Sequence, residues 1–263
     1  SPIGTGTGGQ ILNVLAGRTA TTNTIGTMGT NKYDSLQARA EHRFAHNFQV
    51  GATYTFAKAL GYSTQVAIPD NFRLNYGPLS NIARHSIGVT WIAEAPFGKG
   101  KRWMQSGMGS KLLGGWQLDA VTTLRSGAPF TVTASNTTLN AVGSGQFADC
   151  VSAPRETGNI YQWYDVSSFA TPKAGRFGTC GTNNLTGPGL INADMSLDRN
   201  FSFTERFQLK FRAEVFNLAN TPHHANPTSS ISSGTFMQAL SIANSGREGI
   251  DERTFRFSLR LGW

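Results

Sequence analysis

The chain has 263 residues and a formal net charge of +8, with 23 Lys and Arg against 15 Asp and Glu. Charged residues make up only 14% of it, which argues against a coiled coil or a charged disordered tail. Two cysteines are too few for a disulfide-dense mini-domain or a four-cysteine zinc site. Basic residues are scattered, with the densest cluster at 99–102, so nucleic acid is not an expected partner.

Apolar and polar residues alternate with a period of two in several segments, which predicts strands with one apolar and one polar face. In chain order these segments are 36–44, 48–56, 86–94, 116–125, 191–201, 207–215 and 255–263. Each has about 9–12 residues, which suits the ~9–11 residues of a tilted membrane-spanning strand better than the ~5–6 of an ordinary strand.

The connections between these segments alternate in length. Residues 45–47 and 204–206 are short turns, and 95–114 is intermediate. The long links are about 59–84, 127–189 and 217–251. We expect 127–189 to carry little regular structure, because 126–148 is uncharged and rich in Ser, Thr, Asn and Gly. Short turns at one end and long loops at the other are typical of outer-membrane barrels. The predicted fold class is therefore all-β, an antiparallel up-and-down transmembrane β-barrel.

The last segment has an aromatic C-terminal residue with apolar residues at every second position before it. Such a terminal strand fits the pattern by which the barrel assembly machinery recognises outer-membrane barrels. The residues of this predicted assembly signal are Phe255, Phe257, Leu259, Leu261 and Trp263.

An ordered set of segments resembles the C-terminal barrel of TonB-dependent outer-membrane receptors of the large Oar-like kind. They are YDSLQARAEHRFAHNFQVGATYTFAKAL, RHSIGVTWIAEAPFGKGKRW, LLGGWQLDAVTTLRSGAPFTVT, GPGLINADMSLDRNFSFTERFQLKFRAEVFNLANTPH and RTFRFSLRLGW. The sequence departs from the family pattern at residues 81–83 and at Ala219. The family barrel has about 22 strands, so the resemblance implies that 1–263 is a C-terminal fragment of about seven or eight strands. Residues 1–32 are then a loop or an upstream strand remnant, and 33–263 hold the strands and loops.

The resemblance implies energised import across the bacterial outer membrane, with ligand captured at the extracellular loops. The implied partners are outer-membrane lipid, the N-terminal plug and barrel strands of the same chain, and the TonB complex that acts through that N-terminal part. Two alternatives stay open: a passive porin-like or structural outer-membrane barrel, and a soluble β-rich carbohydrate-binding module. Siderophores, glycan fragments and peptides all remain possible substrates.

Charges in the middle of the strands are candidates for a substrate path or for holding a plug. They are Arg39, Glu41, Arg43, Asp194, Asp198, Lys210, Arg212 and Glu214. The alternative interpretation is that these residues pair with one another across strands and only fill the wall, because opposite charges alternate along the strands.

No pattern indicates catalysis, a metal or a cofactor. Neighbouring His223 and His224 would point apart on a strand, and His42 and His46 would lie about 13 Å apart. The Gly-rich run 4–9 lacks the Lys-Ser/Thr and the helix of a phosphate-binding loop. No Gly-x-Ser-x-Gly occurs in the chain. We therefore expect no enzyme activity, no metal site and no cofactor.

Both cysteines fall in the long link 127–189, in territory that is oxidising if the link is extracellular. We predict a disulfide between Cys150 and Cys180.

Aromatic residues on the apolar face near the short turns predict a belt at the membrane interface. These residues are Phe44, Phe48, Trp116, Phe203, Phe207 and Trp263.

The period of two also predicts the hairpin registers, because the polar faces of paired strands must coincide. A three-residue turn at 204–206 sets Phe203 opposite Phe207, and the pairs that follow are Phe201–Leu209, Asn200–Lys210, Asp198–Arg212, Ser196–Glu214 and Met195–Val215. A three-residue turn at 45–47 similarly predicts the pairs Phe44–Phe48, Glu41–Gly51 and Arg39–Thr53.

Overall fold

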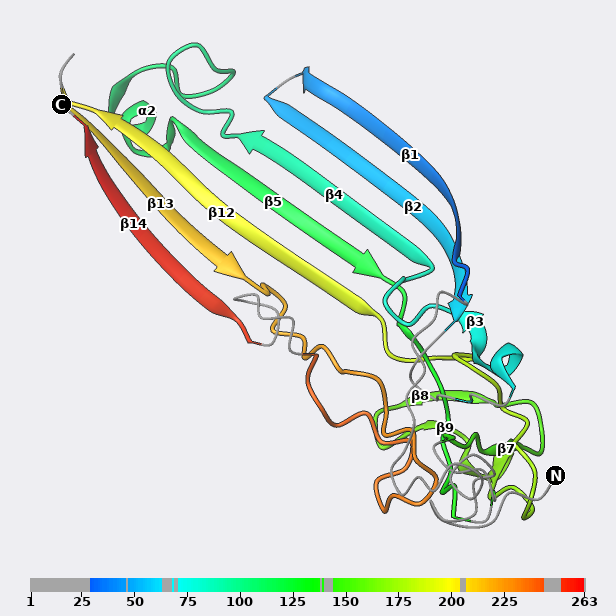
Figure 1. Cartoon of the computed structure of the whole chain (residues 1–263). Helices are drawn as coiled ribbons and strands as arrows, with labels where there is room; N and C mark the ends of the chain where they lie inside the picture. The colour runs from blue at the N-terminus through cyan, green and yellow to red at the C-terminus, as the bar shows by residue number, and fades with distance from the viewer. Residues whose placement is uncertain are drawn as a thin grey trace, which may run out of the picture.

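The computed structural model describes residues 29–45, 47–62, 68, 71–137, 139, 144–203, 207–243 and 252–262. Most of the strand residues lie in one antiparallel sheet with the order β1-β2-β4-β5-β12-β13-β14 (Figure 1). We call these long strands the wall: β1 (Lys32–Ala45), β2 (Phe48–Tyr62), β4 (His85–Glu94), β5 (Trp116–Arg125), β12 (Leu190–Ser202), β13 (Gln208–Phe216) and β14 (Thr254–Gly262). They correspond to the predicted segments, and each pairs with the next along the chain. The sheet is not closed, as expected of part of a larger barrel.

The register of the C-terminal hairpin is the predicted one. β12 and β13 pair Asp198 with Arg212, and the other pairs predicted for these strands are also present. Beyond the paired strands, the Phe203 amide donates to the Phe207 carbonyl at 3.0 Å. The turn 204–206 itself lies outside the described residues. The agreement follows from the side-chain period of two, which leaves only registers that keep both polar faces together.

The register of the first hairpin is predicted correctly only away from its turn. Glu41 pairs with Gly51 and Arg39 with Thr53, as expected. The predicted Phe44–Phe48 pair is wrong, because Ala45 pairs with Phe48 and the register shifts between His42 and Ala45. Two residues therefore separate the strands instead of three. Asn47 has a φ of 67°, the left-handed conformation that two-residue hairpin turns require and Asn tolerates.

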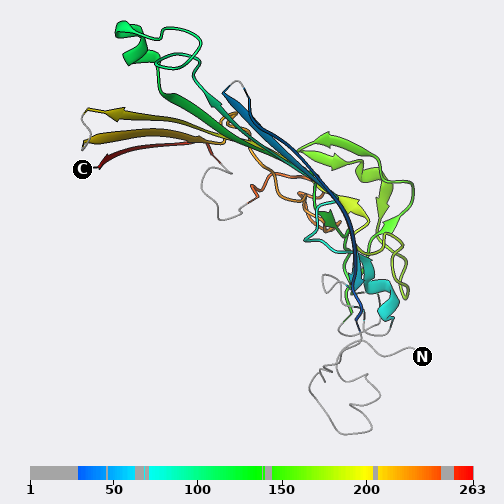
Figure 2. The ribbon, with the colours of Figure 1, turned by 90° about the horizontal axis from the view of Figure 1, so that it is seen from above.

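The two ends of the wall differ. The short connections lie at one end, together with α2 (Gly107–Leu113), and the long links gather at the other (Figures 1 and 2). The short β3 (Tyr76–Pro78) pairs with the far end of β2, and η2 (Phe72–Asn75) precedes it. No helix among the described residues is long and apolar enough to cross a membrane.

The long links are not structureless, which corrects the prediction for 127–189. We call their described parts (68, 71–84, 127–137, 139, 144–189 and 217–243) the loop cluster. Its strands pair as β6–β11, β7–β10 and β8–β9. The elements are β6 (Pro129–Phe130), β7 (Asp149–Cys150), β8 (Glu156–Asn159), β9 (Gln162–Tyr164), η3 (Val166–Ser168), β10 (Phe169–Ala170) and β11 (Leu185–Thr186).

The hydrophobic core of the described chain lies in the loop cluster. One group of buried side chains contains Phe130, Val132, Ala148, Tyr164, Phe169, Cys180, Leu185 and Met237. A second joins Ile68 and Phe147, with Leu74 and Phe177 packed against them. The first group joins the links 127–189 and 217–243, and the second joins 59–84 and 127–189. Burial of apolar surface between links that are distant in sequence therefore orders segments whose composition is typical of loops.

Candidate functional site: a charged wall and an ordered loop cluster

The polar face of the C-terminal strands carries a connected group of charges. Asp198 on β12 has a side chain only 10% exposed, and its Oδ1 lies 3.7 Å from Arg212 Nε and 3.8 Å from Lys210 Nζ on β13. Arg212 also contacts Glu214 at 2.9 Å, and Glu214 contacts Arg256 on β14 at 3.9 Å. Three neighbouring strands thus contribute alternating charges to one surface.

Two members of this group were not among the predicted site residues. Asp119 on β5 accepts hydrogen bonds from Ser196 at 3.4 Å and from Gln117 at 2.8 Å. Arg256 contacts Glu214 as described above. The parity of their strands already places both residues on the polar face, so the periodicity contained the signal.

The predicted residues near the N-terminus form a separate group. Glu41 accepts from Arg39 at 3.1 Å and from Arg43 at 3.2 Å, all within β1. Three strands, β2, β4 and β5, lie between β1 and β12, so the structure does not bring the two groups together. Pairing here runs along one strand instead of across strands as expected.

Asp194, the remaining predicted site residue, contacts amides. Its Oδ1 accepts from the Asn192 side chain at 2.9 Å and from the Asn217 backbone at 2.9 Å. Asn217 follows β13 directly and has a φ of 49°. Asp194 therefore holds the start of a long link in place, which is a structural use of the carboxylate.

A polar pocket of about 230 Å³ lies on the wall between β5, β12 and β13. Its lining includes Gln117, Asp119, Asp198, Lys210 and Arg212. Pockets for small ligands usually measure about 300–1,000 Å³. This pocket is therefore smaller than a typical site for a small ligand.

The pocket at the junction of the wall and the loop cluster is larger, at about 330 Å³. Its lining includes three basic or titratable side chains, Lys58, Arg84 and His85, and the amides of Asn183 and Asn184. Asn183 also joins two links of the loop cluster, since its Nδ2 donates to the Pro78 carbonyl at 2.6 Å. This pocket was not predicted, because its residues come from four segments that no local pattern connects.

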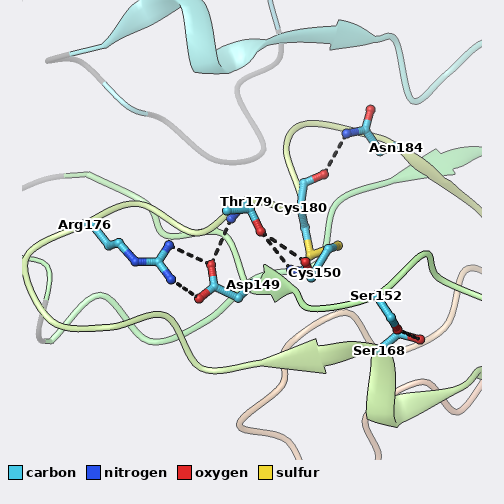
Figure 3. Close-up of a disulfide and its surroundings, with 8 residues drawn as sticks. All are labelled: Asp149, Cys150, Ser152, Ser168, Arg176, Thr179, Cys180 and Asn184. Atoms are coloured by element: carbon cyan, nitrogen blue, oxygen red, sulfur yellow. Dashed lines mark hydrogen bonds and ion pairs between the residues drawn. A yellow bond between two sulfur atoms is a disulfide. The ribbon is translucent and has the colours of Figure 1, made fainter.

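A disulfide joins Cys150 and Cys180, the pairing that the sequence analysis expects (Figure 3). Beside it Arg176 holds both carboxylate oxygens of Asp149, which also accepts from the Thr179 amide at 3.1 Å. The Thr179 hydroxyl accepts from the Cys150 amide at 3.0 Å. A covalent bond, an ion pair and hydrogen bonds therefore fix the same two stretches of the loop cluster to each other.

Two side chains of the loop cluster have shifted pKa values. Burial raises the pKa of Tyr164, whose hydroxyl donates to the Thr186 carbonyl at 3.1 Å. Hydrogen bonds from the Ser167 hydroxyl and amide lower the pKa of Asp165. Both shifts follow from the local fold of the loops.

The histidines that the structure describes do not form a ligand set. His223 is 2% exposed and its Nε2 hydrogen-bonds with the Ile191 carbonyl at 2.9 Å. Among the described residues no three His, Cys, Asp or Glu side chains are grouped as a metal would require. His46 and the Gly-rich run 4–9 lie outside the described residues.

The opposite, apolar face of the wall is uncovered. Large hydrophobic side chains on it are 37–69% exposed, and they include Leu36, Phe48, Ile191, Leu197, Phe207, Phe255, Phe257, Leu259 and Leu261. Phe203, just past the end of β12, is 67% exposed. Of the predicted belt, Trp116 packs edge-on against Phe201 and Phe211. The Phe44 side chain and Trp263 lie outside the description. So many exposed large apolar side chains on one face mark contact with a partner or a membrane.

A comparison with known protein families matches most of the chain. The family model described as "Outer membrane beta barrel domain" matches residues 2–254. The chain belongs to this family. It resides in the bacterial outer membrane. In barrels of this kind the apolar face contacts lipid, the polar face lines the lumen and the long loops are extracellular. The soluble carbohydrate-binding alternative is therefore wrong. No curated protein and no solved structure gives a significant match.

Proposed function

We propose that the chain forms the C-terminal part of the barrel of a TonB-dependent receptor, which captures a ligand outside the cell and imports it. The resemblance of the ordered segments within 33–263 supports this, and so does an open wall whose edge strands β1 and β14 can join further barrel strands. In this proposal the wall contacts a plug that precedes it in the same chain, and the TonB complex pulls on that plug. The protein transports and does not catalyse.

One observation carries the ligand-binding part of the proposal: the ordered loop cluster that sits on the extracellular end of the wall. Two buried clusters order these links, one joining 127–189 to 217–243 and the other joining 59–84 to 127–189. This ordering costs conformational entropy that a passive pore does not require. The junction pocket lies directly below these links and is lined by Lys58, Arg84 and His85. Its charge suits a ligand with anionic groups.

Conductance of the complete protein in a planar bilayer tests the proposal. A receptor whose lumen is occupied by a plug should be closed until the plug is displaced by mild denaturant, and should then conduct. A steady open current from the native protein, with no further opening in denaturant, would overturn the proposal.

A passive or structural barrel is the second candidate, and one observation favours it. The lumen charges mostly contact one another, as in the Asp198–Arg212–Glu214–Arg256 series, so few of them need a ligand or plug as a partner. An immediate, unplugged conductance would support this candidate.

A further inference from the structure

The connection between β4 and β5 exposes a dense group of apolar side chains at the periplasmic end of the wall. Trp103 and Met104 are each 51% exposed, Met108 74%, Leu112 62% and Leu113 46%. The last three belong to α2, which Figure 1 shows beside the turn ends of the wall strands. We call residues 97–113 the turn segment. A short turn that is surrounded by water rarely exposes so many large apolar side chains.

Basic side chains accompany this apolar surface. Lys99, Arg102 and Lys111 are exposed, while Lys101 forms an ion pair with Glu94. No acidic residue occurs between positions 95 and 118, so the turn segment has a net positive charge. Exposed Lys and Arg beside exposed Trp, Met and Leu are typical of elements that lie in a membrane interface.

Contacts from the lipid-facing side of the wall hold the end of α2. Arg199 lies on the same face of β12 as Leu197 and Phe201, yet it is only 8% exposed. Its guanidinium group donates to the carbonyls of Lys111 and Leu112 and stacks over Trp116 at 5.1 Å. The Trp116 indole N–H also donates to the Leu112 carbonyl, at 3.1 Å.

Contacts within the turn segment restrict its conformation. Gly98 and Gly114 touch, so that a Cβ on Gly98 would come within 3.0 Å of the Gly114 backbone. The Phe97 and Trp103 rings lie 5.9 Å apart, and Arg102 lies 5.3 Å from the Trp103 ring. The exposed side chains are therefore presented from a fixed loop.

We propose that the turn segment is a membrane anchor, which inserts Met108, Leu112 and Trp103 among acyl chains and binds anionic phospholipid headgroups of the periplasmic leaflet. Continuity with the lipid face through Arg199 and Trp116 places the segment at the bilayer surface. Basic residues near an anionic membrane surface are attracted to it. A second copy of the chain fits less well, because two such segments would bring like charges together.

Spin labelling of the complete protein in nanodiscs tests the apolar part. Single labels are placed through Met108→Cys and Leu112→Cys, with Leu259→Cys as the lipid reference and Lys173→Cys as the water reference. Labels at 108 and 112 should collide more with oxygen than with a water-soluble nickel complex, as at 259. Labels that behave as at 173 would overturn the proposal.

Nanodiscs of phosphatidylglycerol and of phosphatidylcholine test the headgroup part. The label at 108 should move toward the lipid reference in phosphatidylglycerol, and the combined variant Lys99→Gln, Arg102→Gln, Lys111→Gln should abolish this shift. Identical depth in both lipids would overturn headgroup binding. Immobilisation that rises with the number of protein copies per nanodisc would show that a second copy covers the segment instead.

Discussion

The wall and the loop cluster solve the problem of burying apolar surface in opposite ways. In the loop cluster, aromatic and aliphatic side chains such as Phe147, Val132 and Met237 are at most 1% exposed. Among the described residues of the wall, the only buried apolar residues are Ala57, Ala59 and Ala120. The loop cluster thus buries its apolar side chains inside the protein, whereas the wall places its apolar side chains against the surrounding lipid.

This difference separates the conditions that stabilise each region. The loop cluster needs contacts between its own links and needs the disulfide, and both exist in water. The wall needs a bilayer, because its large residues face outward and its backbone is satisfied by strand pairing. Mutations in one region should therefore leave the stability of the other unchanged.

The largest effect is expected from removing a side chain at the centre of the loop cluster. Phe147→Ala should destabilise the cluster by about 3–5 kcal/mol, because a fully buried ring leaves a cavity. Limited proteolysis of the folded protein measures this as earlier cleavage of the links. Val151→Ala, at a loop position that is 61% exposed, is the control and should change little. A loss of wall folding in bilayers by Phe147→Ala would contradict the independence of the two regions.

Opening the disulfide should come next. Cys150→Ser with Cys180→Ser removes a closure over a sequence separation of 30 residues. In the chain-entropy model this costs the loop cluster roughly 3–4 kcal/mol. Thermal unfolding of the loops, followed by proteolysis with and without reductant, checks the value. Two thiols that alkylate in the folded, unreduced protein would show that the bond is absent.

A charge on the lipid face of the wall should cost less, but only in a bilayer. Leu259→Arg is expected to destabilise folding into bilayers by about 2–4 kcal/mol, because Arg near the membrane midplane loses its hydration. Thr90→Arg is the matched control, since Thr90 is exposed on the polar face and pairs with the uncharged residues Gly51 and Val121. Equal costs at both positions would show that the two faces are not lipid and lumen.

The wall could be predicted from sequence because its signal is local. A period of two fixes the faces, and coincidence of the polar faces then fixes the pairing of Asp198 with Arg212. The predicted register of the first hairpin failed next to its turn. There Asn47 adopts a positive φ, and the turn has two residues instead of the three that the alternation of faces predicts. Polar-face residues Asp119 and Arg256 were within reach of the same argument, whereas the identity of a ligand is not encoded in periodicity.

Apart from the disulfide, the contacts of the loop cluster could not be predicted because they join residues that are distant in sequence. Pro129–Phe130 pairs with Leu185–Thr186, and the Thr133 amide bonds to the Ser229 carbonyl. Close backbone approaches add to this, since a Cβ on Gly127 would overlap the Gly187 carbonyl at 1.7 Å. Such contacts leave no periodic trace in a composition rich in Ser, Thr and Gly.

The smallest effect is expected from the ion pairs of the lumen. A double-mutant cycle with Asp198→Asn and Arg212→Gln should give a coupling of about 0–1 kcal/mol, because the atoms are 3.7 Å apart and Arg212 is 41% exposed to a watery lumen. Folding into bilayers at low and high salt measures this coupling, which salt should reduce further. A coupling above about 2 kcal/mol that resists salt would mean that these charges are desolvated. The lumen side of the wall would then contain charges that are shielded from water. The contrast with the loop cluster would in that case hold only for the lipid face.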